Sequence, residues 1–171
     1  MELVRIEIEE FGNIDLELYP TLAPITVKNF LDLVDKGFYD GTIFHRIIKD
    51  FMAQGGGYVY DKDKNTLYEN GELDPIKGEF RSNGVTNDLQ HTLGVISMAR
   101  TSVKDSATSQ FFICTDSAPH LDGEYAAFGK VTDKESLKVL NKLNNVRTVN
   151  IGGGLSDFPY PVVKIKTIKR L

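Results

Sequence analysis

The chain begins with two runs in which hydrophobic and charged residues alternate. Hydrophobic residues occupy every second position of residues 4–8 and again of residues 14–18, and charged residues stand between them. A period of two places the hydrophobic side chains on one face of a strand. Because Gly12 and Asn13 separate the two runs, the pattern predicts a half-buried β-hairpin that turns at these two residues.

Two later stretches have the spacing of helices. Pro24 suits a first helical position and Gly37 suits the end of the same helix. The hydrophobic stripe of this helix would be Val27, Phe30, Leu31 and Val34. Thr132 and Glu135 form a candidate capping box for a second helix. Its hydrophobic positions would be Leu137, Leu140 and Leu143.

Short hydrophobic stretches rich in β-branched residues fill much of the rest of the chain and predict strands. They cover residues 43–48, 51–55, 93–99, 110–114, 126–131 and 163–168. Residues 61–79 and 144–161 are polar or rich in glycine and proline, which predicts loops. Many strands with only two helices favour a single mainly β domain over residues 1–171, a closed antiparallel β-barrel with helices over its ends.

Composition narrows the class of protein further. Among 171 residues, 41% are hydrophobic and 26% are charged, which is typical of a globular domain, and the net charge is −4 without a run of Lys or Arg. We therefore expect no nucleic-acid partner. The charged N-terminus is unlike a signal peptide, and no hydrophobic run approaches the ~18 residues of a membrane span. Cys114 is the only cysteine, which excludes an internal disulfide. We expect a cytoplasmic monomer with no membrane partner.

Most of the residues that could carry chemistry lack the spacing that their chemistry requires. His45, His91 and His120 are far apart in the sequence and have no partner at ligand spacing, so no metal is expected. The glycines at 55–57 lack the Lys-Ser/Thr of a phosphate loop. Ser97 and Ser109 have no G-x-S-x-G setting, and Cys114 reads as a buried filler. No cofactor is implied.

Arg46 is the exception, because it lies in a strongly hydrophobic stretch. The alternation places Phe44, Arg46 and Ile48 on one strand face and His45 and Ile47 on the other. One interpretation is an arginine at a strand edge that is paired with an acid such as Asp50. The other is an arginine beside a hydrophobic groove that binds a ring with carbonyl groups, such as a proline in a peptide. The groove residues would be Phe51, Met52, Phe111 or Phe112, and Leu121.

Four motifs, in this order and spacing, resemble the cyclophilin family of peptidyl-prolyl cis-trans isomerases. They are FHRIIKDFMAQGG (44–56), ISMART (96–101), SATSQFFICT (106–115) and HLDGEYAAFGKV (120–131). The resemblance covers nearly the whole chain and is nearest to the bacterial cytoplasmic branch. It implies an eight-stranded antiparallel closed β-barrel capped by two α-helices, with the active groove on its outer face and no metal or organic cofactor.

The resemblance also assigns residues to roles. It implies that Arg46 is the catalytic residue, which donates a hydrogen bond to the prolyl nitrogen without a covalent intermediate. The residues implied to bind substrate are Phe51, Met52, Phe112 and Leu121 as pocket walls, Gln54 and Gln110 as polar supports, Ala99, Arg100 and Thr101 as the strand edge beside the peptide, and His120 and Tyr125 as further pocket positions.

Three of these positions depart from the commonest eukaryotic pattern. His120 stands where that pattern has a tryptophan whose indole N–H bonds cyclosporin, Tyr125 replaces a histidine, and Arg100 replaces an asparagine. The implied partners are proline-containing peptides and unfolded or partly folded proteins, with reduced affinity for cyclosporin. Two alternatives remain open: a proline-peptide binding module with little catalysis, and a scaffold that holds a partner through residues 61–79 or 144–161.

Overall fold

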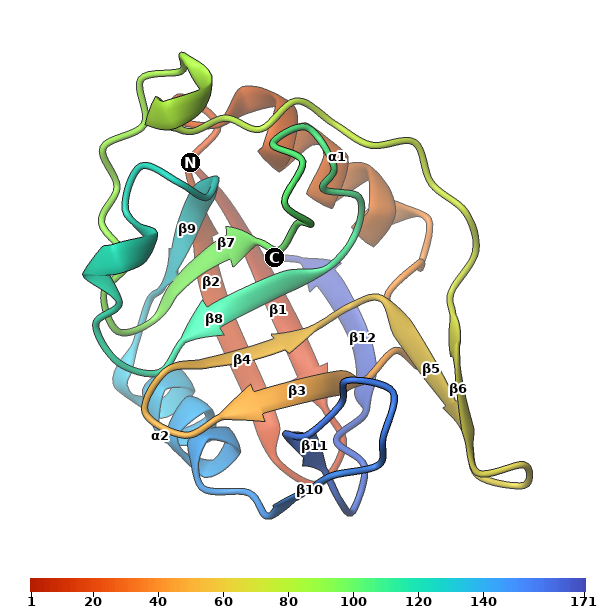
Figure 1. Ribbon diagram of the computed structural model, residues 1–171. Helices are drawn as coiled ribbons and strands as arrows, with labels where there is room; N and C mark the ends of the chain where they lie inside the picture. Colours follow the sequence, from red (N-terminus) through yellow and green to blue (C-terminus); the bar gives the residue numbers. More distant parts are fainter.

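A computed structural model describes residues 1–171 and contains one eight-stranded antiparallel sheet curled around a hydrophobic interior (Figure 1). In order of pairing its strands are β12 (Ile165–Arg170), β1 (Glu2–Ile8), β2 (Gly12–Leu18), β9 (Ala127–Val131), β7 (Val95–Met98), β8 (Phe111–Cys114), β4 (Met52–Gly55) and β3 (Phe44–Ile48). The two edges approach each other through a single bridge between Ile43 and Lys164 rather than a ladder. The predicted eight-stranded mainly β fold is confirmed, although "closed" overstates the contact between the edges.

The two predicted helices are present and lie over the ends of the curled sheet (Figure 1). Helix α1 spans Pro24–Asp35, with proline in its first turn, and Gly37 follows it with a positive φ of 68°, which glycine adopts without strain. The buried Glu79, which is distant in sequence, accepts hydrogen bonds from the first amides of α1, those of Ile25 and Thr26. Neither helix is long and apolar enough to cross a membrane.

Helix α2 (Lys134–Asn144) begins differently from the prediction. The capping residue is Asp133, whose Oδ1 accepts a 2.7 Å hydrogen bond from the amide of Ser136. The predicted capping box of Thr132 and Glu135 is therefore wrong by one residue: Thr132 donates its hydroxyl to Asp133, and Glu135 lies in the first turn. Aspartate caps a helix at least as well as threonine does. Asp133 with Ser136 is therefore an alternative to Thr132 with Glu135 as the start of this helix.

The first hairpin also turns earlier than the sequence suggested. Its turn comprises residues 9–11, and Gly12 and Asn13 already pair with Ile8 and Glu7. The turn requires a left-handed backbone at Glu10, with φ of 69°. Glutamate rarely adopts that conformation, so the sequence favoured Gly12 as the turn residue instead.

The two predicted loops contain short paired strands. Residues 61–79 are not wholly a loop, because β5 (Tyr58–Asp61) pairs with β6 (Thr66–Glu69) in a hairpin that projects from the barrel (Figure 1). Within 144–161, β10 (Thr148–Val149) pairs with β11 (Phe158–Pro159). Most of these residues are at least partly exposed, so they lack the alternation that marks a half-buried strand. Two 3-10 turns, Arg81–Asn83 and Pro119–Leu121, complete the described elements.

The strands β4 and β8 have hydrophobic side chains on both faces, and this feature positions the site. On the inner face, Ala53, Phe111 and Ile113 belong to a cluster of 29 buried residues that fills the barrel. On the outer face there is a separate cluster of five buried residues, one of which belongs to the 3-10 turn at 119–121. Its members are Met52, Phe112, Cys114, Ala118 and Leu121. A hydrophobic face outside the barrel is therefore only partly covered by the rest of the chain.

Candidate active site

A β-bulge in β3 aims Arg46 away from the barrel interior. Phe44 pairs with Gly55 and Arg46 pairs with Gln54, so β3 has one extra residue, His45, opposite a single step of β4. Phe44 is fully buried in the barrel, whereas Arg46 is exposed on the outer face. The prediction that Phe44 and Arg46 share a strand face is wrong, because the bulge changes the alternation between them.

The guanidinium of Arg46 has few partners. Its Nη1 donates a 3.3 Å hydrogen bond to Oε1 of Gln54, and Nε2 of Gln54 donates to Oε1 of Gln110 at 3.0 Å. Asp50, the acid considered as a partner, instead accepts a hydrogen bond from Nδ2 of Asn144. A guanidinium carries five N–H donors, so most of those on Arg46 remain available to a ligand.

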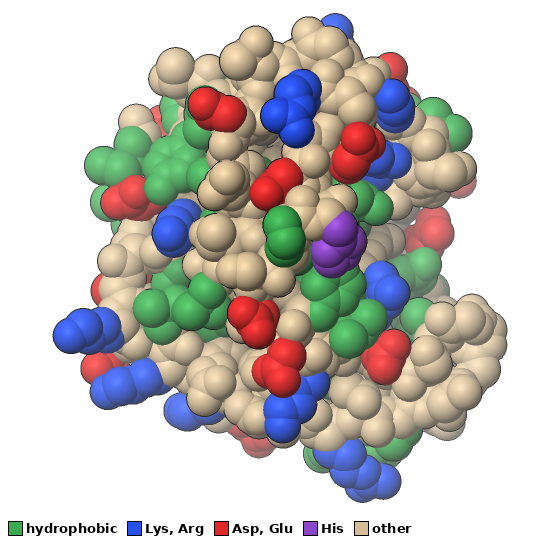
Figure 2. All heavy atoms as spheres, turned by 60° about the vertical axis from the view of Figure 1, so that its left-hand side comes forward, with side chains coloured by type: hydrophobic (Ala, Val, Ile, Leu, Met, Phe, Trp, Pro, Cys, Tyr) green, Lys and Arg blue, Asp and Glu red, His purple; other side chains and the backbone are tan.

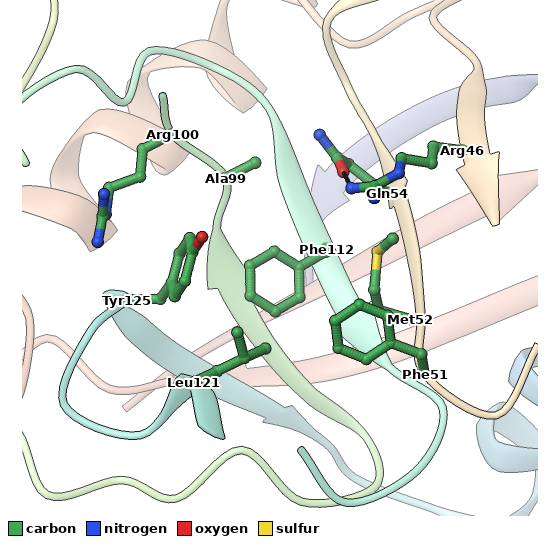
Figure 3. A pocket seen from close by; sticks show the side chains of 9 residues that line it. All are labelled: Arg46, Phe51, Met52, Gln54, Ala99, Arg100, Phe112, Leu121 and Tyr125. Atoms are coloured by element: carbon green, nitrogen blue, oxygen red, sulfur yellow. Dashed lines mark hydrogen bonds between the residues drawn. The ribbon is translucent and has the colours of Figure 1, made fainter. Parts of the chain in front are cut away.

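Beside Arg46 lies a hollow of about 420 Å³ that is open to solvent. The residues that line it are Arg46, Phe51, Met52, Gln54, Ala99, Arg100, Phe112, Leu121 and Tyr125. Figure 3 shows the ring of Phe112 at the centre, with Met52 and Phe51 on one side and Tyr125 on the other. Arg46 and Gln54 lie at the rim beyond Met52. All nine residues were among the site residues predicted from the sequence, and six of them are hydrophobic.

Three other predicted site residues do not line this hollow. Gln110 hydrogen bonds to Gln54 and lines a second, polar hollow next to it. His120 is exposed, and its ring lies 5.5 Å from that of Phe51, which it partly covers. Thr101 is exposed and hydrogen bonds to Ser106 through its amide and its hydroxyl.

The backbone next to the hollow has free hydrogen-bonding groups. The amide of Ala99 still donates to the carbonyl of Gln110, but neither the N–H nor the C=O of Arg100 has a partner in the protein. Exposed, unpaired backbone groups at a strand end can pair with an added extended peptide. The strand edge at 99–101 is therefore open to a peptide at one residue, Arg100.

A buried histidine beneath the hollow was not among the predicted site residues. The ring of His91 stacks on that of Phe112, with centroids 5.9 Å apart. Its Nδ1 lies 3.0 Å from Oδ1 of Asp122 and its Nε2 lies 2.9 Å from Oγ of Ser97. Because a carboxylate accepts, Nδ1 carries the proton and Nε2 accepts from the serine hydroxyl. Asp122 lies 31 residues away in the chain, and no spacing in the sequence indicates this contact.

Ser97, His91 and Asp122 are hydrogen bonded in the same order as the serine, histidine and aspartate of a hydrolase triad. Unlike a catalytic serine, Ser97 is not accessible to a substrate. Ser97 is completely buried, so its hydroxyl meets no substrate. Burial also lowers the pKa of His91, although the neighbouring Asp122 opposes this shift. Cys114 is similarly inert, because burial raises the pKa of its thiol to about 12. These groups support the floor of the hollow.

The surface around the site carries charges of both signs. Figure 2 shows separate hydrophobic patches on this face of the molecule, with basic and acidic side chains between them. No group of three or more His, Cys, Asp or Glu side chains is arranged to hold a metal ion. The face displays no broad field of one sign that would attract a polyanion.

Comparisons with known proteins agree with this geometry. The sequence model of the family described as "Cyclophilin type peptidyl-prolyl cis-trans isomerase/CLD" matches residues 3–170. Peptidyl-prolyl cis-trans isomerase A of Dickeya dadantii is 45% identical over 162 residues, which cover 92% of this chain and 76% of that protein. A peptidyl-prolyl cis-trans isomerase of Acinetobacter baylyi is 46% identical over 163 residues, 92% of this chain and 80% of that protein.

A solved structure is similar over almost its entire length. The cyclophilin-type peptidyl-prolyl cis-trans isomerase of Cryptosporidium parvum, crystallised in the presence of the dipeptide Ala-Pro, superimposes with a TM-score of 0.80 at 32% identity, covering 99% of both chains. The fold and the outer-face pocket thus define the class. The chain belongs to the cyclophilin-type family, and it is a peptidyl-prolyl cis-trans isomerase.

Proposed function

We propose that Arg46 catalyses rotation about Xaa-Pro bonds by donating a hydrogen bond to the prolyl nitrogen. The observation that carries the proposal is an arginine with unused donors at the rim of a hydrophobic hollow whose floor is Phe112. Gln54 accepts one N–H of the guanidinium and fixes its direction without neutralising its charge. Arginine suits this role because its fork of donors is rigid and always charged.

The chemistry follows from the electronic structure of the imide bond. Rotation costs roughly 18–20 kcal/mol because the C–N bond has partial double-bond character. In the twisted transition state the nitrogen is no longer conjugated, so its lone pair accepts a hydrogen bond that the planar ground state refuses. A donor that bonds only the twisted form lowers the barrier, and no covalent intermediate is needed.

The rest of the site would hold the two sides of the bond. Phe112, Met52 and Leu121 bury the proline ring at about 25 cal/mol per Å² of hydrophobic area. The free N–H and C=O of Arg100 pair with the peptide backbone on one side of the proline. One side of the imide bond is then fixed while the other rotates.

The proposed substrates are proline-containing peptides and unfolded or partly folded proteins. The site would contact the proline ring and the peptide backbone of a substrate and no other side chain of it, so peptides of many sequences would fit. A related protein was crystallised with Ala-Pro, which agrees with this substrate class. We also propose that cyclosporin binds with reduced affinity, since His120 replaces the tryptophan of eukaryotic relatives, and that the protein acts as a cytoplasmic monomer.

The decisive variant is Arg46→Ala. Loss of one transition-state donor should lower kcat/KM by roughly 10²–10³-fold in a protease-coupled assay with an Xaa-Pro peptide. Stability should hardly change, because Arg46 is exposed and makes one hydrogen bond. The matched control is Arg147→Ala, an exposed arginine outside the hollow, which should keep full activity.

Two results would contradict the proposal. Unchanged turnover by folded Arg46→Ala would remove the arginine from the mechanism. Tight peptide binding by the natural protein without turnover would favour a binding module, because such a module needs no donor at the prolyl nitrogen.

A further inference from the structure

Arg100 lines the same hollow, but its side chain points away from the centre and lies beside the ring of Tyr125 (Figure 3). A second ring, that of Phe80, lies on the guanidinium as well. The guanidinium carbon lies 4.6 Å from the centroid of the Tyr125 ring and 4.9 Å from that of Phe80. Both distances are within the range of cation–π contacts. Because Phe80 is almost fully buried, it forms a fixed backing for the guanidinium.

Hydrogen bonds hold the guanidinium in this position. Nε and Nη2 of Arg100 donate to the carbonyl of Glu124 at 3.2 and 2.6 Å, and Nη1 donates to the carbonyl of Thr101 at 2.9 Å. Arg100 makes no ion pair: the carboxylate of Glu124 accepts from the hydroxyl of Ser82 instead. All three bonds go to backbone oxygens, so the side chain ties the segment at 124–125 to the strand edge at 99–101.

Tyr125 is the element that this arrangement fixes. Its ring stands between the guanidinium of Arg100 and the ring of Phe112 (Figure 3). It meets Phe112 edge to face, at 5.7 Å and 85°. Tyr125 is thus a wall of the hollow: one side of its ring rests on Arg100, and the other side faces Phe112 and the hollow.

We infer that Arg100 is a positioning residue for the proline pocket: it holds Tyr125 against Phe112. It thereby sets the affinity for substrate, whatever the charge of the residues beside the proline. This inference rests on the proposed isomerase function and adds to it. The competing role is direct attraction of acidic substrates. The geometry disfavours that role, because each of the three guanidinium nitrogens already donates a hydrogen bond and two rings lie on the group.

The test separates KM from kcat for Arg100→Gln and Arg100→Lys, with peptides that carry Ala, Glu or Lys before proline. If Arg100 positions Tyr125, Arg100→Gln should raise KM by about tenfold for all three peptides and change kcat by less than about twofold. A tenfold change corresponds to the loss of about one cation–π contact. Arg100→Lys should restore affinity only in part, because an ammonium lacks the flat fork. The matched control is Arg147→Gln, with unchanged kcat and KM.

A double-mutant cycle links the effect to its target. In a Tyr125→Leu background, Arg100→Gln should raise KM little further, because the ring that Arg100 positions is gone. A rise in KM confined to the Glu-Pro peptide, or full restoration of affinity by Arg100→Lys, would overturn the positioning role. Either result would show that Arg100 recognises the charge of the substrate. Unchanged KM, or full additivity with Tyr125→Leu, would also overturn it. If the natural protein bound peptide without turnover, the isomerase proposal alone would fail, and the same variants would be compared by dissociation constants from NMR titration.

Discussion

The inner and outer faces of β8 are built from adjacent residues but have opposite uses. Phe111 points inward, is completely buried and packs edge-on against Phe30, Tyr39 and Phe44. Phe112 points outward, forms the floor of the open hollow, and lies between the stacked ring of His91 and the edge-on ring of Tyr125. One face supplies stability and the other supplies a binding surface, so substitutions one residue apart should separate the two properties.

The largest expected effects come from the pair Phe111→Ala and Phe112→Ala. Phe111→Ala leaves a cavity in the closed interior and should lower the free energy of unfolding by about 3–5 kcal/mol. Phe112→Ala should cost only about 1–2 kcal/mol, because water fills an open hollow, but should lower kcat/KM roughly thirtyfold through about 2 kcal/mol of lost ring contact. Urea unfolding and the protease-coupled assay measure the two quantities.

This comparison has a clear failing outcome. Equal losses of stability for the two variants, with equal losses of kcat/KM per folded molecule, would show that the faces are not separable. If Phe111→Ala does not fold, Phe111→Leu serves as the milder variant, with a smaller loss of stability and nearly full activity.

Acid should destabilise the fold at the buried His45 of β3 before it affects the carboxylates. Burial, and then the nearby charge of Arg46, lowers the pKa of His45 to about 4, and its Nδ1 has no hydrogen-bond partner. The unfolded chain binds this proton near pH 6.5 and the folded chain does not, so stability is complete above pH 6.5 and falls as the pH drops toward 4. The loss from this group should reach roughly 3 kcal/mol.

The measurement is the free energy of unfolding between pH 7 and 4.5. This window lies above the one for Asp35, Asp105 and Asp133, whose pKa values are lowered by their hydrogen bonds and whose contributions disappear only at more acidic pH. His45→Gln should remove most of the slope, and His91 leaves a remainder of the same sign. The exposed His120→Gln is the control, and an equal slope in His45→Gln would refute the assignment.

A smaller effect is expected at the start of α2, away from both faces of β8. Asp133→Ala removes the side chain that accepts from the amide of Ser136 and should cost about 1 kcal/mol of stability with no change in kcat/KM. Thr132→Val is the matched control, since Thr132 is exposed and contacts the helix only through Asp133. A larger loss in Thr132→Val than in Asp133→Ala would restore the capping box predicted from the sequence.

The sequence predicted the eight strands of the main sheet, both helices and all the residues that line the hollow, because hydrophobic periodicity and family motifs are local signals. It did not predict the short pairs β5–β6 and β10–β11. It did not predict the bulge at His45, which decides that Arg46 faces outward while Phe44 faces inward. A bulge has no characteristic amino-acid composition, because it depends on how the residues of one strand pair with those of the neighbouring strand. The contacts of His91 with Asp122 and of Arg100 with Phe80 were missed for the same reason, since both join segments that are distant in the chain.

The exposed His120, beside the hollow, should tolerate replacement best of all. The exposed ring of His120 lies against Phe51 at an interplanar angle of 34°, so His120→Trp extends an aromatic surface that already exists. If the indole N–H bonds cyclosporin, affinity measured by calorimetry should tighten by about 1 kcal/mol, roughly fivefold, while the free energy of unfolding changes by less than about 0.5 kcal/mol. His120→Phe supplies a ring without the N–H and should gain less. Equal gains for the two variants would assign the effect to ring area, and no gain from tryptophan would show that residue 120 does not limit cyclosporin binding.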